Sequence, residues 1–400
     1  MYEQLAVLAV FVFLFSLVSR RLESTDFSGP MVFVLTGFVM GPAVLGWFPG
    51  EKPDTMLRVL ADLTLALFLF IDAANADLPT LRQRYAIPAR MLLIGLPGAM
   101  VLGFIAAWLM FDTLTLFEAA MLAVMLAATD AALGKAVVTN KTVPARLREG
   151  LNVESGLNDG LCVPILFLFI ALELGTMEGI GSGVALTLLA EELGIGLLVG
   201  TGITAVGAWL LKFCWKRDWV SDVWIQITTV ALALSCFAVA QSLHGSGYIA
   251  AFSGGMLFGF IGRDSTHKLV HSAEGIAETL ALLTWMLFGI AVVGDVLKLV
   301  TWQVFAYALL SLTVVRMLPN FLALSGSGET VSSRLFLSWF GPRGLASIVF
   351  AIIVLQEEIP GAQLIALVVA CTVALSLVLH GVSANPLARW IASREKKDGG

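Results

Sequence analysis

The run Leu-Asn-Val-Glu-Ser-Gly-Leu-Asn-Asp brings four polar side chains together within an apolar stretch that covers residues 150–172. When the stretch is drawn as a helix at 100° per residue, Glu154, Ser155, Asn158 and Asp159 fall within an arc of about 140°. Two carboxylates, a hydroxyl and an amide therefore share one helix face, and all of them offer hard oxygen ligands. Such ligands suit Na+, Li+ or K+, whereas zinc and copper prefer histidine or cysteine.

A purely structural interpretation of this face is that its polar side chains join neighbouring helices by hydrogen bonds. That interpretation fits Ser155 and Asn158. It fits the two acids poorly, because an ionisable group in an apolar phase is costly and marks an ion or proton pathway in most cases. We therefore interpret the face as an ion-binding site.

Small residues and a proline interrupt two further apolar stretches. Thr129 and Asp130 lie amid alanines in 118–138, and Arg343 lies in a Gly-Pro-Arg-Gly sequence in 334–355. Both stretches are predicted to be discontinuous helices. A break exposes the dipoles of two half-helices, so that Asp130 can offset amino-terminal ends and Arg343 carboxy-terminal ends.

The composition identifies the solvent of this chain as lipid. Of 400 residues, 58% are hydrophobic and only 13% are charged, and the mean hydropathy is +0.91. A soluble domain of this length could not bury so much apolar side chain. The fold class predicted is all-α integral membrane, and the net charge of -5 gives no indication of a nucleic-acid partner.

Thirteen apolar stretches are long enough to cross a hydrocarbon core of about 30 Å. They cover residues 4–18, 29–48, 58–75, 89–111, 118–138, 150–172, 193–213, 223–243, 247–261, 271–294, 301–323, 334–355 and 362–385. The two broken stretches are the fifth and the twelfth, an odd offset, which predicts two repeats of inverted topology, about 1–172 and 223–385. Residues 1–385 are thus a single transmembrane domain, and 386–400 a short basic cytoplasmic tail.

The positive charges indicate the orientation of the spans. With the amino terminus outside, eighteen of the 24 Lys and Arg residues fall in cytoplasmic segments and three in outer segments. Because cytoplasmic loops are enriched in Lys and Arg, this asymmetry predicts an outer amino terminus and a cytoplasmic carboxy terminus.

The Thr129-Asp130 pair, the Glu-Ser-Gly-Leu-Asn-Asp run and the Gly-Pro-Arg-Gly-Leu-Ala-Ser sequence resemble the monovalent cation/proton antiporter superfamily. The resemblance is to sodium/proton exchangers of the NhaP and NHE type, and it extends over essentially the whole chain. It implies that Asp159 binds proton and cation alternately, that Asn158 holds the crossover near Thr129, and that Ser155 and the Thr129 backbone complete a Na+ site. Asp130 belongs to the same ion-binding group.

The resemblance also implies an ion pair between Glu154 and Arg343 that supports the site, and it places Asp72 as an acid near the cytoplasmic funnel. Two departures from the family pattern affect helix geometry and selectivity: an alanine follows Asp130 where proline is common, and Gly156 occupies a leucine position. A homodimer in a bacterial plasma (inner) membrane is implied as well, with no cofactor.

The function predicted is electroneutral exchange of one Na+ or Li+ for one H+ by alternating access, in the service of pH homeostasis. Three alternatives stay open: a K+/H+ antiporter with the same site, a cation channel, and a membrane enzyme acting on a lipid substrate. Separately, Glu274 and Glu278 are one turn apart in the tenth span, and we expect them to pair with Arg316 of the eleventh.

Overall fold

The computed structural model describes residues 2–23, 28–48, 54–75, 86–130, 133, 135–138, 140–177, 179, 181–262 and 266–398. Every regular element within these ranges is helical. The first half of the chain forms α1 (Tyr2–Glu23), α2 (Gly29–Met40), α3 (Asp54–Asn75), α5 (Ala86–Arg90), η1 (Met91–Gly95), α6 (Leu96–Met110), α7 (Leu116–Met125), α8 (Lys135–Val138) and α9 (Ala145–Met177). The second half forms α10 (Ser182–Trp215), α11 (Asp222–Ser242), α12 (Gly247–Gly262), α13 (Thr266–Phe288), η3 (Gly289–Val293), α14 (Gly294–Leu299), α15 (Trp302–Leu310), η4 (Ser311–Val315), α16 (Arg316–Ala323), α17 (Val331–Trp339), α18 (Leu345–Gln356) and α19 (Ala362–Asp398).

Each of the thirteen predicted spans coincides with one helix or with a row of helical segments. The fourth, tenth and eleventh spans each contain a π-helical stretch, namely η1, η3 and η4. Among the described residues, six helices are long and apolar enough to cross a membrane on their own, and six further apolar helices are shorter. The all-α membrane fold predicted from the sequence is confirmed.

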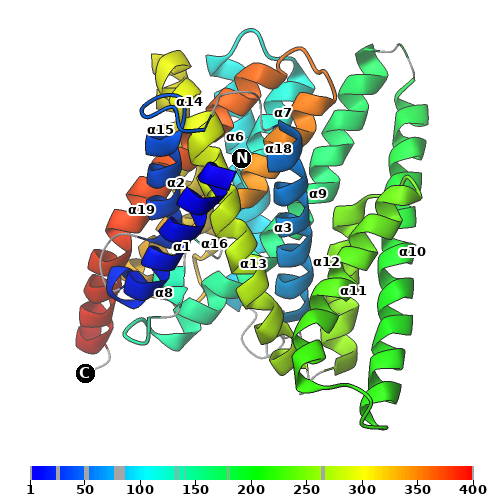
Figure 1. Ribbon diagram of the computed structural model, residues 1–400. Helices are drawn as coiled ribbons and strands as arrows, with labels where there is room; N and C mark the ends of the chain where they lie inside the picture. Colours follow the sequence, from blue (N-terminus) through cyan, green and yellow to red (C-terminus); the bar gives the residue numbers. More distant parts are fainter. Residues whose placement is uncertain are drawn as a thin grey trace.

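The helices form one bundle, in which α10, α11 and α12 lie at one edge (Figure 1). The long helix α9 is central, because it packs against α3, α7, α10, α12 and α18. A continuous apolar core joins these helices, and its fully buried side chains include Phe70, Val163 and Phe350.

The two predicted helix breaks are present. Between α7 and α8, residues 126–130 have no helical conformation beyond a turn, and residues 340–344 separate α17 from α18. We call these two stretches the crossover. Pro342 and the flanking glycines explain the second break, since proline cannot donate a backbone hydrogen bond and glycine disfavours the helix.

The contacts at the start of α7 show how the half-helix is held in place. Thr115 Oγ1 accepts the Glu118 N–H at 3.2 Å, and Glu118 Oε2 accepts the Thr115 N–H at 2.8 Å, which is a capping box. The other oxygen, Glu118 Oε1, accepts the backbone N–H of Gly361 at 2.6 Å, just before α19 begins. The start of α7 is thereby fixed to the loop between the last two spans.

One boundary differs from the prediction. The segment 386–398, expected as a tail, continues α19 without interruption past Pro386. Ala388 and Ile391 are fully buried in a second apolar cluster with Leu147 and Leu337, which belong to α9 and α17. The segment stays helical because apolar residues recur on one of its faces and pack against this cluster.

Candidate functional site

Hydrogen bonds join the two stretches of the crossover and the helices that flank them. The Asp130 N–H donates to the Pro342 carbonyl at 2.9 Å, and the Ser347 hydroxyl donates to the Met125 carbonyl at 2.7 Å. Unwound backbone within lipid needs such partners, because no water is present to satisfy it. The contacts therefore allow two broken helices to meet in the apolar core.

Asp130 lies at the amino-terminal end of α18, as the sequence predicts. Its Oδ2 accepts the N–H of Leu345, the first residue of α18, at 2.9 Å, and its Oδ1 accepts the N–H of Leu133 at 3.3 Å. A side chain at Gly344 would overlap the Asp130 carboxylate, which explains the glycine. A carboxylate here satisfies orphan N–H groups and offsets the positive end of the helix dipole.

Arg343 lies at the carboxy-terminal end of α7, again as predicted. Its Nη1 donates to the carbonyls of Ala127 and Ala128 at 3.1 and 3.2 Å, and its side chain is completely buried. Its Nε and Nη2 atoms have no hydrogen-bond partner among the residues that the structure describes. The guanidinium thus compensates the negative end of the half-helix rather than a carboxylate.

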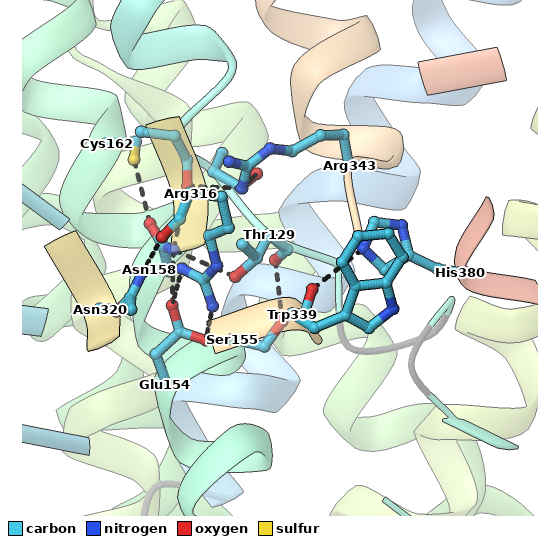
Figure 2. Close-up of polar contacts among 12 residues, drawn as sticks. Thr129, Glu154, Ser155, Asn158, Cys162, Arg316, Asn320, Trp339, Arg343 and His380 are labelled. Atoms are coloured by element: carbon cyan, nitrogen blue, oxygen red, sulfur yellow. Dashed lines mark hydrogen bonds and ion pairs between the residues drawn. The ribbon is translucent and has the colours of Figure 1, made fainter. Parts of the chain in front are cut away.

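The polar face of α9 contacts the first stretch of the crossover directly (Figure 2). Ser155 Oγ donates to the Thr129 carbonyl at 2.9 Å. The Asn158 amide Nδ2 lies 3.0 Å from Thr129 Oγ1, 3.2 Å from the Ala127 carbonyl and 3.1 Å from Glu154 Oε1. Asn158 therefore links the α9 face to the unwound stretch near Thr129, as the resemblance implies.

The partner of Glu154 differs from the expectation. Glu154 accepts two hydrogen bonds from Arg316, Nη1 to Oε1 at 2.9 Å and Nη2 to Oε2 at 3.1 Å, and both side chains are 1% exposed. The predicted pair of Glu154 with Arg343 is wrong, because Arg343 is directed to the α7 carbonyls. The predicted pairing of Arg316 with the acids of the tenth span is also wrong, because Arg316 binds Glu154. Of those acids, Glu274 contacts Asn75 and His271.

Asp159 is the carboxylate of the α9 face that no ion pair neutralises among the described residues. The residue is half-buried, and its buried Oδ1 atom has no hydrogen-bond partner in the described part of the chain. The backbone of Thr129 lies beside it, and the acids Asp72, Asp130 and Glu154 are close enough to act on it electrostatically. A carboxylate oxygen in this situation is available to a proton or to a cation.

Asp72 reaches the same neighbourhood from α3. A Cβ atom at Gly156 would lie 3.2 Å from the Asp72 Cβ, so that the two residues are in contact. One turn further, a Cβ at Gly160 would overlap the ring of Phe252 from α12. The glycine at the leucine position of the family pattern therefore makes room for Asp72 near Asp159. The other departure, Ala131, lies outside the described residues.

A cavity of about 20 Å³ lies beside the crossover, and its lining includes Thr129, Asp130, Glu154 and Ser155. A space of this size accommodates one water molecule. An unhydrated monovalent cation is of comparable size. Among the described residues, no group of three or more His, Cys, Asp or Glu side chains is arranged to hold a metal ion.

Three polar residues next to the site were not anticipated from the sequence. Cys162 donates from Sγ to Asn158 Oδ1 at 3.2 Å. In α19, Ser376 accepts the N–H of Arg343 in the second stretch of the crossover, and His380 contacts Trp339 directly before that stretch. The spacing of Ser376 and His380, four residues apart in an apolar run, is a signal that could have indicated them, since buried polar pairs in a span need a purpose.

The chain is similar to known proteins over almost its whole length. A family model described as sodium/hydrogen exchanger, transmembrane, matches residues 7–390. The chain is 26% identical over 394 residues to a K+/H+ antiporter, NhaP, of Alkalimonas amylolytica, an alignment that covers 97% of this chain and 67% of the relative. It is also 26% identical over 378 residues to a Na+/H+ antiporter of Saccharomyces cerevisiae, covering 88% of this chain and 38% of the relative.

The fold matches that of the sodium proton antiporter MjNhaP1 from Methanocaldococcus jannaschii, with a TM-score of 0.75 and 18% identity. The match covers 98% of this chain and all of the other. The chain spans about two thirds of the length of the bacterial relatives that it resembles in sequence.

Proposed function

The chain belongs to the sodium/hydrogen exchanger family, and on that premise we propose that it exchanges Na+ or Li+ for H+ in a one-to-one, electroneutral cycle. The observation that carries the proposal is the Asp159 carboxylate, which is half-buried beside the crossover and has one buried oxygen to which no described residue donates a hydrogen bond. Proton and cation would occupy this carboxylate in turn, which obliges one to leave before the other enters.

The cation would complete its coordination shell with oxygens of the crossover and of the neighbouring α9 face. Ser155 Oγ and the Thr129 carbonyl lie 2.9 Å apart, so both can face one ion next to Asp159. Asp130 would act through its charge, because both of its carboxylate oxygens accept backbone N–H groups. Asp72 would contribute a second carboxylate from α3, an extension of the funnel role expected of it.

The energetics follow from one shared carboxylate. If one proton is exchanged for one cation, no net charge crosses the membrane, and the potential, worth about 2.3 kcal/mol per charge per 100 mV, does not drive transport. One pH unit is worth about 1.4 kcal/mol, which sustains a cation gradient of about tenfold.

Alternating access would come from a rigid-body movement of the half that carries the crossover against the other half. The first group would be α5–α9 with α15–α19, and the second α1–α3 with α10–α14. The Gly156 and Gly160 contacts with Asp72 and Phe252 lie on the boundary between them. Inverted repeats that meet at a central site move in this way in other secondary transporters.

The proposal also includes the assembly and the orientation of the protein: a homodimer in a bacterial plasma membrane, with an outer amino terminus and a cytoplasmic carboxy terminus.

A K+/H+ antiporter is the second candidate, and the names of the bacterial relatives favour it. The same oxygens would serve K+, so the choice depends on the size of the site when the ion is bound.

The test is dissipation of a pH gradient in proteoliposomes on addition of Na+, Li+ or K+, with and without a clamped membrane potential. Asp159→Asn should abolish the exchange, since an amide cannot trade a proton for a cation. Asp112→Asn, an exposed acid between α6 and α7, is the matched control and should exchange like wild type. Full exchange by Asp159→Asn would move the site elsewhere, and a response to K+ alone would select the second candidate.

A further inference from the structure

The second stretch of the crossover is braced by α19 on a face that the ion-binding residues do not use. The Arg343 N–H donates to Ser376 Oγ at 2.7 Å, and the Ser376 hydroxyl lies 3.1 Å from His380 Nδ1. His380 Nε2 lies 3.1 Å from the Trp339 carbonyl, at the end of α17. Ser376 therefore binds the backbone within the break, and His380 binds the backbone directly before it. Figure 2 shows His380 beside Trp339.

The hydrogen-bond partners indicate which groups can donate in this network. A carbonyl can only accept, so Nε2 of His380 carries a proton and donates it to Trp339. Ser376 Oγ accepts from the Arg343 amide, so its own hydrogen is free to be donated to Nδ1 of His380. Nδ1 also lies 3.1 Å from the Ser376 carbonyl, so each ring nitrogen has a backbone carbonyl within hydrogen-bond distance.

Packing holds the imidazole in this orientation. His380 is 3% exposed, its ring lies 5.0 Å from that of Trp339, and Phe340 approaches from the side at 6.4 Å. Trp339 is itself tied to α19, since its Nε1 donates to Ser383 Oγ at 2.9 Å. The ring therefore has little freedom to leave the Trp339 carbonyl.

We propose that His380, acting with Ser376, is a positioning residue for cation exchange. It fixes the unwound stretch 340–344, and through that stretch it sets Arg343 against the α7 carbonyls and Leu345 against Asp130. The proposal rests on the proposed function, because the reaction that it serves is exchange at the crossover. Neither side chain needs to touch the ion.

The test compares His380→Leu with His380→Gln, which keeps a donor and an acceptor at similar reach. His380→Leu removes one hydrogen bond each from the Trp339 carbonyl and the Ser376 hydroxyl, which keep only their bonds to Gly341 N–H and Arg343 N–H. It should therefore lower the exchange rate per folded protein about tenfold and raise the half-maximal cation concentration. His380→Gln should recover most of the rate. Ser376→Ala should resemble His380→Leu, because the Arg343 N–H loses its acceptor.

Thr372→Val is the matched control. Thr372 is equally buried in α19, but its hydroxyl donates within the helix, to Val368 at 2.7 Å. Its loss should leave exchange and cation affinity unchanged.

Hydrogen-exchange mass spectrometry of the peptide that covers 339–346 gives an independent measurement. Amide protons there should exchange faster in His380→Leu than in wild type or Thr372→Val. Unchanged protection would overturn the proposal, as would a His380→Leu protein that is less stable yet exchanges cations normally per folded molecule. Since the protection measurement needs no transport, it tests the brace even if Asp159→Asn were to disprove the proposed function.

Discussion

The buried pair of Glu154 and Arg316 allows a quantitative test of the site's framework. Two hydrogen bonds of 2.9 and 3.1 Å join the side chains, and each side chain is 1% exposed. Removal of one partner leaves a buried charge uncompensated, which costs about 3–5 kcal/mol. Glu154→Gln and Arg316→Met should each lower the free energy of unfolding by about that amount.

The double variant should be more stable than either single variant. Replacing both members of a buried ion pair by neutral side chains is commonly neutral or even stabilising, because neither charge then needs to be desolvated. The coupling energy of the double-mutant cycle should therefore reach several kcal/mol. Unfolding in mixed micelles, followed by tryptophan fluorescence, measures all four proteins.

Arg343→Met provides the comparison, since Arg343 is also a buried arginine close to Glu154. It binds the carbonyls of Ala127 and Ala128, so its coupling to Glu154→Gln should be much smaller. A coupling to Arg343 that equals or exceeds that to Arg316 would refute the assignment of the pair and return it to the partner expected from the sequence.

Two further changes test the surroundings of the ion site. Gly156→Leu should weaken cation binding about tenfold or more, because its side chain would displace Asp72, whose Cβ lies 3.2 Å from the position of the new Cβ. Gly202→Leu is the control, since no described atom lies within 4 Å of a Cβ at that position. Equal effects of the two variants would disprove the contact with Asp72. Asp130→Ala should destabilise the protein by about 1–2 kcal/mol through loss of the cap on Leu345; thermal unfolding in detergent measures it, and an unchanged midpoint would mean that the cap contributes nothing.

Features that depend on neighbouring residues in the chain could be predicted from the sequence. The spans follow from runs of apolar residues, and the breaks follow from small residues and proline at the fifth and twelfth spans. The roles of Asp130 and Arg343 at half-helix ends were predictable too, because the dipole assigns a sign to each end whatever the tertiary contacts.

The partner of Arg316 could not be predicted in this way. The π-helical segment η4 ends at Val315, directly before this residue. A π-helical turn contains an extra residue, so the side chains after it are rotated by about 100° from the face that a regular helix would give them. Arg316 therefore points to α9, where it binds Glu154, and not to the acids of the tenth span.

His380 escaped prediction for a different reason. Its partners are backbone groups of Trp339 and, through Ser376, of Arg343, and backbone groups look alike in every sequence. The burial of Ala388 and Ile391 was missed because Arg389 lies between them and further basic residues follow from Arg394, which masks an apolar face of α19. Both cases depend on where the helix lies in three dimensions and not on its composition.

The charges around the crossover bear on the proposed stoichiometry. Arg316 and Arg343 bring two buried positive charges, and Glu154 and Asp130 bring two negative ones, so this framework balances by itself. The carboxylates left over are Asp159 and Asp72, and neither forms an ion pair among the described residues. If Asp159 alone trades its proton for the cation, the pair keeps the same total charge throughout the cycle and the membrane potential does not drive exchange. If cation binding also released a proton from Asp72, two protons would leave for each cation and one net charge would cross the membrane. The exchange rate would then change with the value at which the membrane potential is clamped. The closeness of Asp72 to Gly156 on the α9 face thus makes the potential-clamp measurement the decisive one for electroneutrality.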